Sequence, residues 1–179
     1  MFLSLLEKRR SIRKYLEKTI EPEKVDKLIE AALRSFSGKG GQPWEFVIVD
    51  DRDMLLKLST AKPGGATFLK NATLGIVVCA DQSSDTCVED ASIASAIIHL
   101  SATDLGLGSC WIQIRNRNHS DGRPAQEYIA ELLGIPSNLM VLSVVAMGYP
   151  DESKDPHAKA ALRFDKIHKG RFGTKMVGE

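Results

Sequence analysis

Apolar and small residues fill almost every position between Val88 and Leu105, and no continuous polar stripe separates them. A helix with this pattern has no face suited to water, so we expect it to be buried all round. Its serine and threonine hydroxyls can bond to their own helix backbone and still let another backbone approach closely. Gly106 to Gly108 ends this helix, and the bulky run from Ser109 to Ile114 predicts a strand.

The other elements follow from the spacing of the remaining apolar residues. Helical spacing predicts helices at 2–6, 23–33, 54–58 and 124–133, and short apolar runs predict buried strands at 46–49, 74–80 and 140–147. Interleaved helices and strands indicate an α/β or α+β domain over residues 1–150. Residues 151–179 form a mixed charged extension with scattered apolar side chains, which we expect to pack on a second subunit.

Composition narrows the class of protein. The net charge of +1 gives no electrostatic case for nucleic acid or for an anionic membrane. Cys79, Cys87 and Cys110 follow no CxxC spacing, which favours reduced thiols and a cytoplasmic protein. The apolar run at 1–6 is too short for a signal sequence or a membrane span.

A basic cluster follows the first predicted helix. Lys8, Arg9, Arg10, Arg13 and Lys14 place five cations around one hydroxyl, that of a serine at position 11. The cluster could be a solvated helix end that complements the helix dipole. It could equally be an anion site, because arginine presents a planar fork that matches phosphate oxygens. The segment alone leaves both readings open.

The usual signatures of catalysis by the protein itself are missing from the sequence. The four histidines are scattered, with no HExxH pair and no cysteine at zinc spacing, so we expect no metal site. There is no GxSxG elbow, and Gly106-Leu107-Gly108 lacks the third glycine and the strand context of the dinucleotide fingerprint. An anion site with glycine-rich loops but no nucleophile suggests that a bound cofactor supplies the chemistry.

Three segments in order resemble the nitroreductase family of flavin enzymes. Arg9 to Tyr15 looks like its N-terminal phosphate motif, Ser37 to Trp44 like its serine-containing loop ending in Gln-Pro-Trp, and Gly106 to Ile112 like its helix-to-strand motif. Their order and spacing also match, and the resemblance extends over residues 5–149.

The resemblance implies a fold, an assembly and a reaction. The family fold is an α+β, three-layer α-β-α sandwich that forms an intertwined homodimer with two FMN molecules at the interface. The implied function is an FMN-dependent NAD(P)H oxidoreductase, in which flavin N5 passes a hydride from NADH or NADPH to a nitroaromatic or a quinone by a ping-pong mechanism. No side chain need act as a general acid or base.

By position, the resemblance also implies which residues bind FMN. Arg9, Arg10 and Ser11 would hold the phosphate. Arg13 would lie near the pyrimidine edge of the ring, where a cation stabilises the negative charge gained on reduction. Ser37 and Gln42 would come from the other subunit. Gln113 and Ile114 would present backbone N–H groups to flavin N5 and O4. Lys159 and Arg163 are the candidates for a phosphate ligand near the C-terminus.

Departures from the family pattern affect the pocket over the ring and leave alternatives open. Phe36 and Gly40 stand where family members often have Pro and Asn, and Gln113-Ile114 replaces Glu-Gly or Gly-Gly. The polar Arg115 to Arg123 loop could favour other flavin chemistry, such as dehalogenation, dehydrogenation or flavin destruction. A low-turnover flavin-binding redox sensor is another alternative, and a nucleic-acid binder is disfavoured by the charge.

Overall fold

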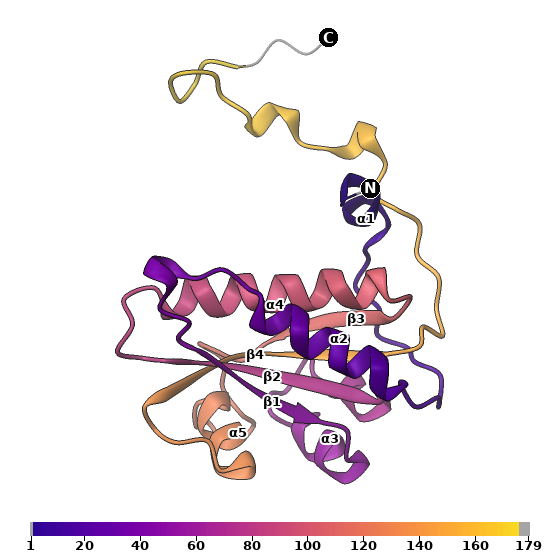
Figure 1. Cartoon of the computed structure of the whole chain (residues 1–179), viewed down its shortest axis with the longest axis vertical. Helices are drawn as coiled ribbons and strands as arrows, with labels where there is room; N and C mark the ends of the chain where they lie inside the picture. The colour runs from indigo at the N-terminus through magenta and orange to yellow at the C-terminus, as the bar shows by residue number, and fades with distance from the viewer. Residues whose placement is uncertain (1, 176–179) are drawn as a thin grey trace.

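A four-stranded antiparallel sheet lies at the centre of the computed structural model, which describes residues 2–175. The strands are ordered β1-β2-β4-β3 (Figure 1). They comprise β1 (Trp44–Val49), β2 (Leu74–Asp81), β3 (Gly108–Gln113) and β4 (Leu139–Gly148). β1 and β3 are therefore the edges of the sheet, and the longest strand, β4, lies inside it.

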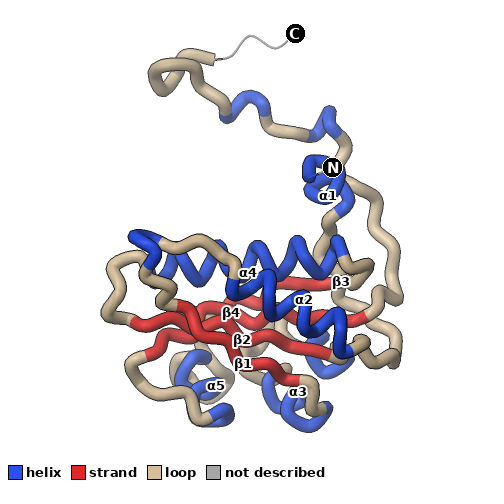
Figure 2. Tube along the Cα trace, in the orientation of Figure 1, coloured by secondary structure: helices blue, strands red, loops and turns tan. Residues whose placement is uncertain are grey.

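Helices cover both faces of the sheet, as Figure 2 shows. α2 (Pro22–Leu33) and α4 (Cys87–Asp104) lie on one face, and α3 (Arg52–Leu58) and α5 (Ala125–Leu133) on the other. α1 (Phe2–Lys8) contacts the C-terminal end of α4. Four short 3-10 helices lie at 38–40, 67–71, 159–161 and 164–166. The three-layer α+β prediction is confirmed, and each predicted helix or strand begins and ends within two residues of its observed bounds.

The period of two along the strands divides the core into two halves. In β2, Ile76 and Val78 pack with α2 and α4, whereas Val77 and Cys79 pack with α3 and α5. All four side chains are buried, so this central strand has no solvated face. Burial of both faces explains why the sequence of β2 is almost continuously apolar.

The α4 helix is not buried all round by its own chain. Its sheet-facing side is fully buried, as at Ala94 and Ile98. The opposite side leaves Ala96 exposed and Ile97 and Leu100 partly exposed. Burial all round, as expected from the sequence, therefore needs something beyond one chain.

The segment after α1 runs along the edge of β3. Ser11 forms a parallel bridge with Ser109, and the Ile12 N–H donates to the Ser109 carbonyl at 2.9 Å. Gly108 makes this approach possible, because a Cβ at that position would lie 2.7 Å from Cγ2 of Ile12. The backbone of the basic cluster is thereby fixed against the first half of β3.

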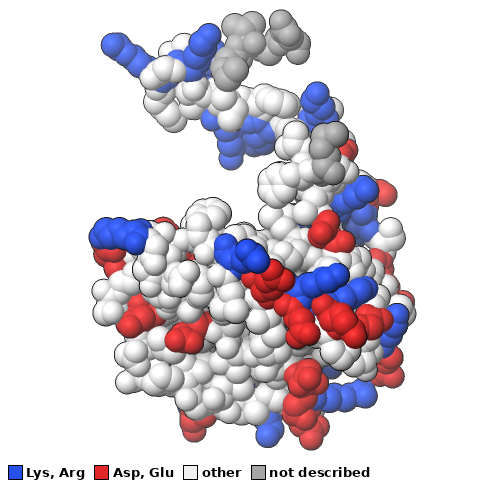
Figure 3. Space-filling model, viewed as in Figure 1, with Lys and Arg blue, Asp and Glu red and all other residues white. Residues whose placement is uncertain are grey.

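Beyond β4, residues 151–175 form an extended arm that leaves the body (Figure 1). Phe164 is 60% exposed and Phe172 is 92% exposed, so the arm has apolar side chains without a core of their own. Met176, which the sequence also suggests as a packing residue, lies outside the described residues. Figure 3 shows acidic and basic side chains intermixed on the visible face of the body, whereas most of the charged residues in 159–175 are Lys or Arg. Among residues 2–175, no helix is long and apolar enough to cross a membrane.

Candidate functional site

Cys110, the third residue of β3, directly follows Ser109, which forms a bridge with Ser11. Burial raises the pKa of this thiol, and Arg13, the Ser11 hydroxyl, Lys154 and Arg9 oppose that shift. The contacts show that distant stretches of the chain meet here: Ser11 bridges Ser109, the Arg9 guanidinium lies 3.0 Å from His99, and the Lys154 ammonium donates to the Ser11 carbonyl. Three of the four groups that oppose the shift were predicted as cofactor-binding residues from the sequence, and Lys154 was not.

The arginines of this cluster have no acidic partners. Within residues 2–175, no carboxylate forms a salt bridge with Arg9, Arg10 or Arg13. Uncompensated cations held close together repel one another, and a bound anion would relieve that repulsion. Guanidinium forks beside a hydroxyl form the donor set that a phosphate group requires. The residues present therefore fit the phosphate of a cofactor such as FMN.

The start of the arm holds the backbone of this segment. The Glu152 carboxylate accepts from the Arg13 N–H at 2.5 Å and from the Lys14 N–H at 3.3 Å. The Lys154 ammonium donates to the Ser11 carbonyl at 2.6 Å and pairs with Glu152 at 3.2 Å. No sequence signal predicts these contacts, because about 140 residues separate the partners.

A buried histidine links Arg9 to β3. One guanidinium nitrogen of Arg9 lies 3.0 Å from Nε2 of His99, and Nδ1 of His99 hydrogen-bonds to the Ser109 hydroxyl. His99 is 7% exposed and lies on α4. Burial, and then the nearby Arg9 charge, lower the pKa of His99 to about 4. The sequence could have indicated a role for His99 only because it is a histidine within a mostly apolar helix.

The second predicted segment is held at the N-terminal end of α4. The Ser37 hydroxyl accepts from the Gln42 N–H at 2.9 Å, which closes the loop. Asp90, only 2% exposed, accepts from the Gly38 N–H at 2.9 Å and from the Thr86 hydroxyl at 2.8 Å. A buried carboxylate must be satisfied in this way, so Asp90 fixes the position of the loop.

One chain does not bring the two segments together. Asp90 holds the 37–42 loop and His99 holds Arg9, and nine residues of α4 (99 minus 90) separate them. At 1.5 Å per residue this corresponds to about 13.5 Å along the helix axis. Figure 1 shows the loop and the basic segment at opposite ends of α4.

The backbone amides at the end of β3 differ in availability. The Ile114 N–H donates to the Leu142 carbonyl at 3.0 Å, so it is not free for a ligand, and this corrects the expectation for Ile114. Gln113 pairs with Ser143. Because hydrogen-bonded pairs alternate along an antiparallel ladder, the Gln113 N–H points away from β4 at the open edge of the sheet.

Lys159 and Arg163 lie in the arm, and within residues 2–175 no hydrogen bond or ion pair joins either one to the Arg9 cluster. Arg163 donates to both carboxylate oxygens of Asp165, at 2.7 and 2.6 Å. Neither residue therefore completes the phosphate site within one subunit. In the described chain, Lys154 is the C-terminal cation that reaches the cluster.

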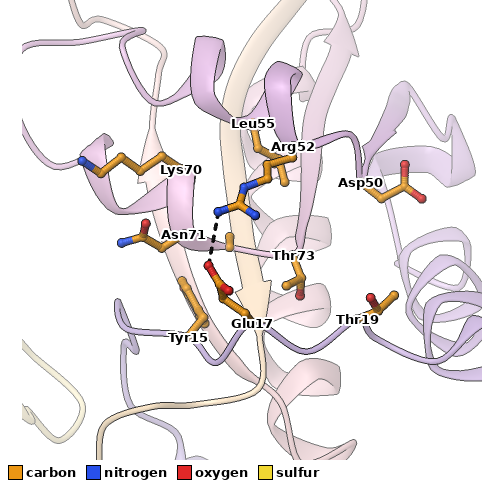
Figure 4. A pocket seen from close by; sticks show the side chains of 10 residues that line it. Tyr15, Glu17, Thr19, Asp50, Arg52, Leu55, Lys70, Asn71 and Thr73 are labelled. Carbon is orange, nitrogen blue, oxygen red and sulfur yellow. Dashed lines mark hydrogen bonds and ion pairs between the residues drawn. The ribbon is translucent and has the colours of Figure 1, made fainter.

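A cavity of about 460 Å³ opens where β1 ends and β2 begins, between Asp50 and Thr73 (Figure 4). Figure 4 shows Arg52 and Glu17 facing each other across it, and their ion pair measures 3.2 Å. Both side chains are more than four-fifths exposed, so this pair stabilises little. None of the ten predicted cofactor residues lines the cavity.

The Arg115 to Arg123 loop uses its polar side chains internally. The His119 ring stacks on Tyr128 of α5 with centroids 4.3 Å apart, and Asp121 lies 3.0 Å from His119. Arg123 pairs with Glu131 of α5 at 2.5 Å. These contacts make the distal half of the loop a cap on α5, whereas Arg117 and Asn118 in its first half are exposed.

Comparisons with known proteins show which family this chain resembles. The sequence pattern of the nitroreductase family matches residues 6–62 and 54–149. A relative from Archaeoglobus fulgidus, provisionally named NADH dehydrogenase/NAD(P)H nitroreductase, is 40% identical over 177 residues, which cover 95% of this chain and 98% of the relative. A solved structure, that of an FMN-dependent nitroreductase from Clostridium difficile R20291, is 47% identical, with a TM-score of 0.93 over 95% of this chain and 99% of that one. The FMN reductase [NAD(P)H] of Bacillus subtilis is 28% identical over 79% of this chain and 62% of the relative.

The lowered pKa of His99 predicts a specific loss of stability in acid. The unfolded chain protonates this residue near pH 6.5 and the folded chain near pH 4, so the folded state loses stability as the pH falls between those values. For this one group the loss between pH 7 and pH 5 should be about 2 kcal/mol. Denaturant unfolding at both pH values and one protein concentration should show this loss in the wild type, and His99→Gln should lack it. An equal pH dependence in the two proteins would contradict the assignment.

Proposed function

The chain belongs to the nitroreductase family, and we propose that it is an FMN-dependent NAD(P)H oxidoreductase that works by a ping-pong mechanism. The observation that supports this most directly is the segment beside β3 with Arg9, Arg10 and Arg13, which form no salt bridge with a carboxylate within residues 2–175. The names of the Clostridium difficile and Bacillus subtilis relatives refer to FMN, and the latter also to NAD(P)H. The three free thiols support a cytoplasmic location.

Bound FMN would supply the hydride chemistry, accepting from NADH or NADPH and donating to a nitroaromatic or a quinone. The residues of the chain position the group and provide charge. Arg9 and Ser11 hold the phosphate, with Arg10 beside them, because a guanidinium and a hydroxyl donate directly to its oxygens. Arg13 provides a cation where the ring gains electron density, and its guanidinium lies 5.7 Å from the centre of the Phe68 ring.

The remaining contacts divide between the two subunits in this proposal. The Gln113 N–H at the open edge of β3 is oriented to donate to the ring. Ser37 and Gln42, together with Lys159 or Arg163 of the arm, come from the other subunit, because one chain keeps them away from Arg9.

A homodimer is part of the proposal for physical reasons. The uncovered side of α4, the apolar side chains of α1 and those of the arm all need a partner. An antiparallel pairing of two α4 helices would place the 37–42 loop of one subunit near Arg9 of the other. The start of the arm stays on its own subunit through Glu152 and Lys154, and the arm beyond Lys154 would lie on the partner.

Anaerobic spectroscopy tests the reaction. Purified protein should be yellow, NADH or NADPH should bleach it, and a nitroaromatic or a quinone should restore the colour after the oxidised nicotinamide has been removed by gel filtration. Recovery without nicotinamide is the expected result of a ping-pong mechanism. A yellow protein that resists bleaching would indicate a redox sensor, and a colourless one that takes up no FMN would contradict the proposal.

Arg9 should matter for FMN and not for riboflavin, which lacks the phosphate. Hydrogen bonds to a charged group are worth about 1.5–3 kcal/mol, so Arg9→Ala should weaken FMN binding at least about tenfold. Lys14→Ala is a matched control, because Lys14 is an exposed cation of the same segment, and it should change affinity by less than about threefold. Fluorescence titration of the apoproteins with both flavins measures this, and unchanged FMN affinity in Arg9→Ala would place the phosphate elsewhere.

Sedimentation equilibrium at micromolar concentration should give a dimer. Ile97→Glu adds a charge to the uncovered side of α4 and should shift the protein toward monomers, because burying an unpaired charge is costly. Leu56→Glu, at an exposed leucine of α3, should leave the dimer intact. A compact wild-type monomer would rule out the shared site.

A further inference from the structure

We infer that His99 is a positioning residue that orients the Arg9 guanidinium for the cofactor phosphate. This inference rests on the proposed function, since it assigns a role within the same site. Arg9 Nη1 and His99 Nε2 are 3.0 Å apart. A guanidinium has only donors, so Nε2 must be the acceptor and the imidazole must be neutral.

The other side of the ring fixes the same tautomer. With Nε2 accepting, the proton of the ring lies on Nδ1, which faces the Ser109 hydroxyl. That hydroxyl lies 3.3 Å from the His99 backbone carbonyl, so it can donate there while it accepts from Nδ1. Every polar atom of the imidazole then has a partner of the correct kind.

The support behind His99 is rigid. Ser109 is 1% exposed on β3, and His99 lies on the buried side of α4 beside Ile98 and Ala102. The Arg9 side chain is only partly buried, and it would otherwise lose conformational freedom on binding. A fixed acceptor restricts the guanidinium before the ligand arrives and leaves its other N–H groups available.

Affinity measurements on the full-length protein separate this role from a general structural one. His99→Leu removes the acceptor and should weaken FMN binding about tenfold, equivalent to about 1.4 kcal/mol, while riboflavin affinity stays unchanged. His99→Gln retains a neutral carbonyl acceptor and should recover most of the loss. In an Arg9→Ala background, His99→Leu should have no further effect on FMN, because the guanidinium that it orients is absent.

Two more variants keep the test informative if His99→Leu folds poorly. Ser109→Ala removes the acceptor that orients Nδ1 and should weaken FMN more than riboflavin. Thr103→Ala is the control: its hydroxyl bonds to the His99 carbonyl at 3.2 Å and not to the ring, so both affinities should be unchanged.

The outcomes distinguish the two levels of inference. If Arg9→Ala weakens FMN but His99→Leu or Ser109→Ala does not, or if these variants weaken riboflavin equally, the role of His99 is overturned and the proposed function stands. Additive losses in the double variant would also overturn it. If wild type and Arg9→Ala bind FMN with the same affinity, the phosphate assignment itself fails, and the role of His99 fails with it.

Discussion

The structure depends on one constraint: α4 is a mostly apolar helix that cannot face water, and the few polar side chains buried on it must find partners. Asp90 finds them in the loop that contains Gly38, and His99 finds them in Arg9 and Ser109. The buried helix therefore fixes two surface segments at its opposite ends. An α-helix is stiff, so the spacing between these segments is set by the helix and not by the loops.

This arrangement explains how a chain without a nucleophile or a metal motif can still organise a reactive site. The groups that would contact the cofactor belong to irregular segments, which are the most mobile parts of most proteins. Here Glu152 and Lys154 bond to the backbone beside Ser11 and Arg13, and Gly108 lets that backbone lie against β3. Preorganisation of this kind lowers the cost of ordering the site on binding.

The sequence predicted most of this fold, because apolar periodicity determines which residues form helices and strands. It also identified the basic segment and the 37–42 loop through resemblance. It could not show that His99 reaches Arg9 or that Glu152 reaches Arg13, since those contacts depend on tertiary packing. The expectation for the Ile114 N–H came from the resemblance, which matches positions and not hydrogen bonds. In this chain the register with β4 directs that N–H to the Leu142 carbonyl.

The chemical nature of residue 99 follows from the same electrostatics. A carboxylate there would also accept a hydrogen bond from Arg9, but it would neutralise the guanidinium and compete with an incoming phosphate. A neutral imidazole orients the cation and leaves its charge intact. The nearby carboxylate of Glu152 is bonded to backbone N–H groups and to Lys154, so it does not cancel the arginines either. Within residues 2–175 no carboxylate pairs with these arginines, so their charge is available to an anionic ligand.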